Sequence, residues 1–161
     1  MYGRCRASGE GVEWADMVKV TKSLVETHDE ARKFLASLAP KDVGATVVAL
    51  KGDLGAGKTA FTQGIALALG VEEAVTSPTF VLEKVYRLVG HAFSRLIHID
   101  AYRLEGVDEL RQLGWDELVR DPGNLICVEW GERILEALPK DTRWIEFTFL
   151  DTKTRQIDFK E

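Results

Sequence analysis

Residues 52 to 59 read Gly-Asp-Leu-Gly-Ala-Gly-Lys-Thr, which is the spacing G-x-x-x-x-G-K-[ST] of a phosphate-binding loop. Glycines let successive backbone N–H groups turn toward one anion, and a following helix adds the positive end of its dipole. A lysine at position 58 can reach the terminal phosphates, and a threonine hydroxyl is a hard oxygen ligand for Mg²⁺. The loop therefore predicts a nucleoside triphosphate site formed by Gly52, Asp53, Leu54, Gly55, Ala56, Gly57, Lys58 and Thr59.

Two acidic residues follow short apolar runs farther along the chain. Asp100 comes after Leu-Ile-His-Ile, and Glu129 comes after Leu-Ile-Cys-Val. Ligands gather at the carboxyl ends of strands in open α/β sheets, and a phosphate-binding loop needs a second acidic group near its Mg²⁺. We expect Asp100 and Glu129, with Lys58, to be the catalytic residues, the two carboxylates holding the metal or orienting the attacking water. The alternative for either carboxylate alone is a helix cap or a surface position.

Two other features each have a structural and a functional interpretation. The segment Thr-Ser-Pro-Thr that ends at Thr79 is either a proline turn with hydroxyl caps or a switch whose hydroxyls sense the terminal phosphate. Trp130 directly follows Glu129 and is either a core residue or an anchor for a partner. The sequence has no Asn-Lys-x-Asp segment, so guanine specificity has no support.

The elements that must position these residues follow from apolar spacing. A capping-box pattern that starts at Thr27 predicts a helix ending before Pro40, and Gly70 closes a second helix that follows the loop. We expect strands at 18–24, 46–50, 80–89, 96–99 and 125–128, helices at 60–69 and 107–119, and a terminal hairpin at 142–150 and 155–159. This order predicts an α/β fold of the P-loop NTPase type, with three layers, a mainly parallel sheet and a C-terminal β-hairpin.

Length and charge limit the classes of protein that remain. The chain has 161 residues, with 21 basic and 26 acidic side chains and a formal net charge of -5. This length fits one domain, which we expect to span residues 18–161. The negative net charge argues against independent nucleic-acid binding. No apolar window is long enough to span a bilayer, and the arginine-containing start of the chain lacks the apolar core of a secretory signal. We expect residues 1–17 to be a disordered leader on a cytoplasmic protein.

Five segments in order give a family resemblance: GDLGAGKT, SPTF, HIDAYRLE, LGWDEL and CVEWGERI. Together they resemble the TsaE (YjeE) family, the ATPase component of bacterial tRNA threonylcarbamoyladenosine synthesis. The resemblance covers roughly residues 21 to 159. The combination of SPTF with the DAYRL and VEW segments is far more specific than the phosphate-binding loop alone.

The resemblance implies ATP and Mg²⁺ as ligands and assigns roles at matching positions. It implies that Thr59, Asp100 and Glu129 belong to the metal site and that Thr79 belongs to a switch. The start of the family's N-terminal helix lies near the nucleotide base, which would bring Thr27 and His28 close to adenine. The departures from the family pattern, which are Ala101, Val81 and Trp115, do not touch the phosphate or metal residues.

The resemblance also implies an activity and partners. The chain would be an ATPase that is slow alone and stimulated in a complex with the TsaB and TsaD proteins. It would contact tRNA only indirectly. The modified nucleotide would be the adenosine at position 37 of tRNA. Two alternatives stay open: a small-metabolite or nucleotide kinase, although no lid insertion is evident, and a nucleotide-gated binding module with negligible turnover.

Overall fold

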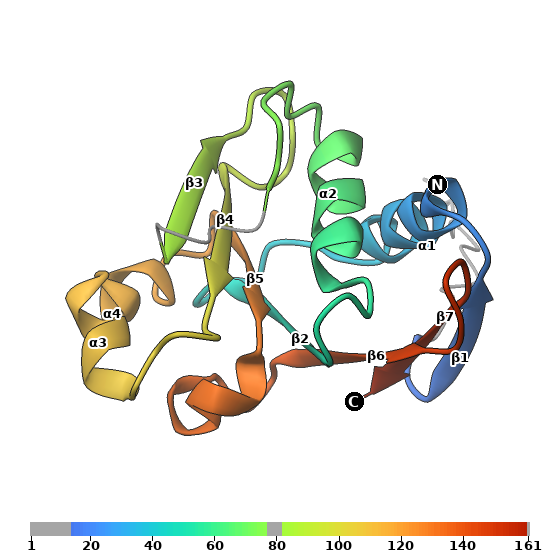
Figure 1. Cartoon of the computed structure of the whole chain (residues 1–161). Helices are drawn as coiled ribbons and strands as arrows, with labels where there is room; N and C mark the ends of the chain where they lie inside the picture. The colour runs from blue at the N-terminus through green and yellow to red at the C-terminus, as the bar shows by residue number, and fades with distance from the viewer. Residues whose placement is uncertain (1–13, 77–81, 161) are drawn as a thin grey trace, which may run out of the picture.

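The structure is a computed structural model that describes residues 14–76 and 82–160. The strands within these ranges are β1 Met17–Thr21, β2 Thr46–Gly52, β3 Glu83–Arg87, β4 Arg95–Asp100, β5 Asn124–Glu129, β6 Arg143–Phe149 and β7 Arg155–Lys160. They form one sheet in the order β1-β7-β6-β2-β5-β4-β3. The strand that precedes the phosphate-binding loop, β2, therefore lies at the centre of the sheet (Figure 1).

The centre and the edges of the sheet differ in strand direction. Strand β2 pairs in parallel with both β5 and β6, and β4 pairs in parallel with β5. At the edges, β3 runs antiparallel to β4, while β7 runs antiparallel to both β6 and β1. The predicted parallel sheet is thus confirmed for the four central strands, and the predicted C-terminal hairpin is confirmed as β6–β7. A short turn can join only antiparallel neighbours, which explains the direction of β7.

Helices cover both faces of the sheet, as the three-layer prediction requires. They are α1 Leu24–Ala36, α2 Lys58–Ala68, α3 Val107–Gln112, α4 Trp115–Leu118 and the 3₁₀ helix η1 Gly131–Ala137. Helices α1 and α2 pack side by side on one face, and α3, α4 and η1 cover the other (Figure 1). The sequence analysis did not predict η1. None of the helices in the described ranges has the length and apolar character of a membrane span.

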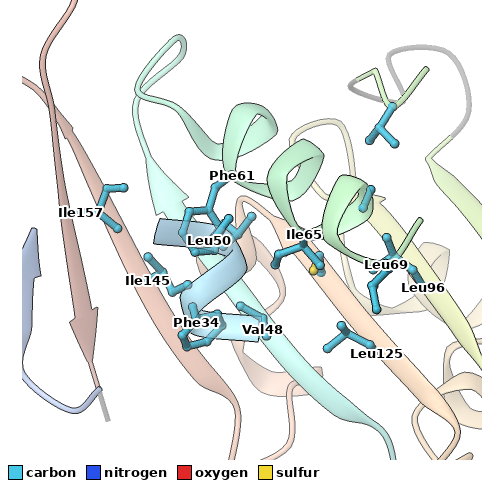
Figure 2. Close-up of a cluster of buried hydrophobic side chains, with 14 of the residues drawn as sticks. Phe34, Val48, Leu50, Phe61, Ile65, Leu69, Leu96, Leu125, Ile145 and Ile157 are labelled. Carbon is cyan, nitrogen blue, oxygen red and sulfur yellow. The ribbon is translucent and has the colours of Figure 1, made fainter. Parts of the chain in front are cut away.

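Two apolar cores hold the layers together, one on each side of the sheet. Figure 2 shows the larger core, where Phe34 of α1 and Phe61 of α2 pack against Leu50 of β2. On the opposite face, Val47 of β2 packs in the core that includes Leu110 of α3. Successive residues of β2 point to opposite faces, so both faces must be apolar. This explains why the strand reads as a continuous apolar run.

Helix α1 begins about one turn earlier than the capping-box prediction at Thr27. Its N-cap is Ser23, whose hydroxyl accepts a 3.2 Å hydrogen bond from the backbone N–H of Glu26. Thr27 is instead buried within the first turn, with its hydroxyl 2.8 Å from that of Thr21. Both Ser23 and Thr27 are followed by a glutamate three residues later, so the spacing alone fits either start. Tertiary contacts on the Thr27 side chain decided between them.

The described chain is packed from Trp14 onward. Trp14 is buried, with its ring centroid 5.7 Å from that of Phe34 and 4.8 Å from that of Phe159. The packed part therefore starts four residues before the predicted boundary at residue 18. The rest of the predicted leader, residues 1–13, lies outside the described residues.

Candidate phosphate-binding site

A cavity of about 980 Å³ lies at the carboxyl ends of β2, β4 and β5. Its walls come from five segments that are far apart in the sequence: the 52–59 loop, the end of β4, the end of β5, the start of α1, and the turn between β6 and β7. The predicted site residues that line it are Leu54, Gly55, Gly57, Lys58, Thr59, Asp100, Glu129 and Thr27. The strand ends bring together the loop and both carboxylates, as expected for a ligand site in an open α/β sheet.

The loop keeps its shape because glycines occupy its strained or crowded positions. Gly52 has φ +147°, and a Cβ placed there would lie 2.6 Å from the carbonyl oxygen of Phe147 on β6. Gly57 has φ +115° and is the N-cap of α2. Only glycine adopts such backbone conformations without strain. The loop therefore leads directly into the N-terminus of α2, where backbone N–H groups and the helix dipole favour an anion.

Lys58 lies in the floor of this cavity and is only 4% exposed. Its ammonium donates hydrogen bonds to two carbonyls of its own loop, those of Gly52 and Asp53, the latter at 2.8 Å. Burial lowers the pKa of Lys58, while nearby carboxylates, with Glu129 foremost, oppose that shift. A buried cation whose hydrogen bonds within the described residues go to carbonyl oxygens is a favourable site for a phosphate anion.

Thr59, Glu129 and His98 form a chain of side-chain hydrogen bonds below the loop. The Thr59 hydroxyl donates to both oxygens of Glu129, at 2.8 and 3.1 Å. The Nε2 atom of His98 lies 2.7 Å from the same Oε1 of Glu129. Glu129 is 3% exposed and His98 is fully buried. The sequence analysis did not select His98, although its place two residues before Asp100 on one strand puts both side chains on the same face of the sheet.

Asp100 is the register partner of Glu129 on the neighbouring parallel strand. Its Oδ1 accepts a 2.9 Å hydrogen bond from the backbone N–H of Tyr102, and the residue also lines the cavity. Asp100 therefore both caps the turn that follows β4 and lies at the site. One hydroxyl and two carboxylates, from Thr59, Asp100 and Glu129, are hard oxygen ligands that fit Mg²⁺.

The described ranges contain no group of three or more His, Cys, Asp or Glu side chains that could hold a metal ion. Mg²⁺ is usually held by one or two carboxylates together with water and substrate phosphates.

Trp130 closes the cavity beside the loop. Its backbone has φ +60°, a left-handed conformation that is uncommon for a large side chain, and its N–H donates to the carbonyl of Leu50 at 2.9 Å. The indole lies over the Lys58 ammonium, 4.1 Å from nitrogen to ring centroid. The centroid of the Tyr102 ring is 5.0 Å from that of Trp130. Trp130 is thus a half-buried wall of the site, and Tyr102 joins it without having been predicted.

The turn between β6 and β7 forms the wall that the sequence analysis missed. Thr152, Lys153 and Arg155 line the cavity there. The Nε of Arg155 donates to the carbonyl of Gly55 at 3.2 Å, and its Nη1 donates to that of Asp151 at 2.7 Å. Arg155 therefore ties the C-terminal hairpin to the phosphate-binding loop. A contact between residues one hundred positions apart leaves no local signal in the sequence.

The start of α1 forms a further wall, next to the β6–β7 turn, because Thr21 at the end of β1 is the register partner of Arg155. Thr27 lines the cavity together with Lys22, Ser23 and Leu24. His28 is not among the lining residues, and its Cα lies where a Cβ on Gly64 of α2 would meet it at 2.8 Å. Of the two residues that were expected near a base, Thr27 therefore lines the cavity and His28 does not. Thr79, the predicted switch residue, lies outside the described residues.

Comparisons with known proteins agree with the fold. A family model described as "Threonylcarbamoyl adenosine biosynthesis protein TsaE" matches residues 21–157. Among curated relatives, the tRNA threonylcarbamoyladenosine biosynthesis protein TsaE of Treponema pallidum is 43% identical over 113 residues, which cover 70% of this chain and 79% of the relative. The TsaE protein of Bacillus subtilis is 40% identical over 135 residues, which cover 83% and 78%. A crystal structure of Bacillus subtilis YdiB aligns with a TM-score of 0.65 and 31% identity, covering 89% of this chain and 84% of that one.

Proposed function

This chain belongs to the TsaE family, which acts in tRNA threonylcarbamoyladenosine biosynthesis, and we propose that its part in that process is the Mg²⁺-dependent binding and hydrolysis of ATP. The observation that supports this most strongly is one hydrogen bond. The Thr59 hydroxyl of the phosphate-binding loop donates to Glu129 at the end of β5, at 2.8 Å. It joins two of the expected Mg²⁺ ligands in the lining of a cavity large enough for a nucleotide.

Each residue of the site has a role that its position supports. The loop N–H groups and the start of α2 would bind phosphate oxygens, and Lys58 would neutralise charge on the terminal phosphates. Thr59 and Glu129 would hold Mg²⁺, with Asp100 beside them as a further ligand or as the residue that orients the attacking water. When bound, Mg²⁺ would supply positive charge against the phosphate oxygens of ATP.

The proposed partners are the TsaB and TsaD proteins. The family resemblance suggests them, and the net charge of -5 fits a protein that contacts tRNA only indirectly. In this proposal ATP hydrolysis supports the complex, while transfer of the threonylcarbamoyl group takes place on TsaD. A role in tRNA modification also implies a cytoplasmic location.

The test is the rate of ATP hydrolysis by the purified chain, alone and with TsaB and TsaD. We expect slow turnover alone and a clear increase with both partners. Lys58→Ala should abolish turnover, since the buried ammonium is the cation of the loop, and circular dichroism would confirm that this variant is folded. A Lys58→Ala variant that hydrolyses ATP at the parent rate would contradict the assigned site.

The same preparation separates the two alternatives. Robust phosphate transfer from ATP to nucleosides or sugars without partners would identify a kinase and overturn the proposal. Tight ATP binding with no hydrolysis, either alone or with the partners, would identify a nucleotide-gated binding module. Stimulated hydrolysis without phosphate transfer is the outcome that supports an ATPase.

A further inference from the structure

His98 lies beneath the proposed metal site and has no contact with the cavity. It lies within β4, where the register pairs it with Cys127 of β5. Glu129 lies two residues beyond Cys127 on the same face of the sheet. The imidazole of His98 therefore reaches diagonally across to the carboxylate, with 2.7 Å between Nε2 and Oε1. Thr59 and Glu129 line the cavity, whereas His98 does not.

The carboxylate of Glu129 is hydrogen-bonded by two side chains, those of Thr59 and His98. Thr59 approaches from the loop, on the cavity side, and His98 approaches from the interior of the sheet. A carboxylate that is only 3% exposed needs such partners, because burying an unpaired charge is costly. Thr59 is itself a proposed Mg²⁺ ligand, so the bond from His98 is the one that does not depend on what occupies the cavity.

The surroundings of His98 explain why a polar residue would be kept at this position. Three of its neighbours on the same face are apolar: Leu96 on its own strand and Leu125 and Cys127 on β5 all belong to one core. Its register partner on β3 is Lys84. Its second ring nitrogen, Nδ1, is buried and has no hydrogen-bond partner in the described structure. An apolar residue would fill this space without leaving a polar atom unpaired. The bond to Glu129 is what the imidazole adds.

We propose that His98 is a positioning residue that fixes the orientation of the Glu129 carboxylate, through an Nε2–H···Oε1 hydrogen bond, so that its remaining lone pairs face Thr59 and the cavity. The inference rests on the proposed function and adds to it a group that touches neither nucleotide nor metal. Hydrogen-bond partners of this kind hold ligating side chains in place, and their loss typically weakens metal affinity about 10- to 100-fold.

The test uses two amide variants that differ in reach. In His98→Gln the amide nitrogen is as many bonds from Cβ as Nε2 is, so it can still donate to Glu129. In His98→Asn the amide reaches only the position of Nδ1, so it cannot. Both variants put an amide in the same buried site, and both therefore carry a similar cost of burial.

Calorimetric titration with ADP, at zero and at increasing Mg²⁺ concentrations, separates the two steps of binding. We expect both variants to bind Mg²⁺-free ADP within about twofold of the parent, because the loop is unchanged. The Mg²⁺ concentration needed for half of the Mg²⁺-dependent increase in affinity should rise about 10- to 100-fold in His98→Asn and stay near the parent value in His98→Gln. Thermal unfolding reports the fold of each variant, and His98→Leu replaces His98→Asn if the latter does not fold.

The outcomes distinguish this inference from the proposed function. A parent chain that binds ADP with no dependence on Mg²⁺ overturns the proposed function, and the inference about His98 with it. A parent with clear Mg²⁺ dependence, and a His98→Asn or His98→Leu variant with the same dependence, overturns only the role of His98. An equal loss in His98→Gln and His98→Asn also overturns it, because it would show that the ring is needed for its shape rather than for its bond to Glu129.

Discussion

The ammonium nitrogen of Lys58 lies 4.1 Å from the ring centroid of Trp130. Trp130 adopts φ +60° in the position just after Glu129, at the tip of β5. A non-glycine residue in this conformation costs roughly 1–2 kcal/mol, so the surrounding structure must hold it there. A cation over an indole face is worth about 0.5 kcal/mol when exposed and about 2 kcal/mol when desolvated. The strand tip that carries Glu129 therefore also holds the lysine of the phosphate-binding loop.

Replacing Trp130 should weaken nucleotide binding in proportion to the loss of the aromatic face. We expect Trp130→Leu to lower ATP affinity by about 2- to 30-fold, the equivalent of roughly 0.5–2 kcal/mol, and Trp130→Phe to fall between Leu and the parent. Calorimetry with a non-hydrolysable ATP analogue measures this. Equal affinity in the Leu variant and the parent would show that the indole does not help to hold Lys58 in its binding position.

Arg155 should support the phosphate-binding loop from the C-terminal hairpin. Arg155→Ala removes the hydrogen bond to the Gly55 carbonyl and should cost about 1 kcal/mol, or roughly fivefold in nucleotide affinity. Arg155→Lys keeps the positive charge but loses the planar set of guanidinium donors. This variant therefore separates the effect of the charge from the effect of the hydrogen bonds to the loop. If Lys restores the parent affinity in full, the guanidinium acts through its charge on the phosphates and not by holding the loop.

The thiol of Cys127 should be inert in the folded protein. Burial, with Glu129 adding to the effect, raises the pKa of Cys127 from 9.0 to about 12. In a Cys5→Ser background, we expect no alkylation by iodoacetamide at pH 8.5 under native conditions and full alkylation in denaturant. Labelling of the native chain at the rate of a free thiol would mean that β5 is accessible from solvent.

The same shift predicts how stability depends on pH. Because the folded state keeps this proton at pH values where the unfolded state releases it, the thiol contributes stability that is fully present below about pH 9 and is lost as the pH rises toward 12. The slope is at most about 1.4 kcal/mol per pH unit. Urea unfolding of the parent and of Cys127→Ala between pH 8 and 10.5 measures it. The parent should lose stability faster with rising pH than the variant.

The close packing of α1 on α2 should make Gly64 intolerant of substitution. A Cβ at Gly64 would lie 2.7 Å from the Cβ of Ala31 and 2.8 Å from the Cα of His28, so the helices must separate. Overpacking of this kind costs about 1–3 kcal/mol, and we expect a cost near the upper end because the new Cβ would meet backbone. This cost exceeds the gain of about 1 kcal/mol that Gly64→Ala brings in helix propensity. Gly106→Ala is the control, because a Cβ there meets nothing within 4 Å. Thermal unfolding should show a lower midpoint for Gly64→Ala than for the parent, and no such decrease for Gly106→Ala.

Local signals in the sequence carried much of the fold and the centre of the site. The loop at 52–59 is contiguous, and its own glycines allow the backbone conformations that it needs. The apolar runs before Asp100 and Glu129 predicted buried strands that end at carboxylates, and the register of β4 with β5 places those carboxylates side by side. The start of α1 was misplaced because Ser23 and Thr27 offer the same capping pattern.

By itself, then, the sequence determined the central parallel strands, the phosphate-binding loop, the two carboxylates at the strand ends, and the family. The tertiary structure alone decided that His98 lies behind Glu129, that Arg155 holds the loop from one hundred residues away, and that Trp130 turns its indole over Lys58. The physical reason is the range of the interactions. Turn, strand and helix preferences act over a few neighbouring residues, whereas the outer walls and support of this site come from side chains that only sheet pairing and packing bring together.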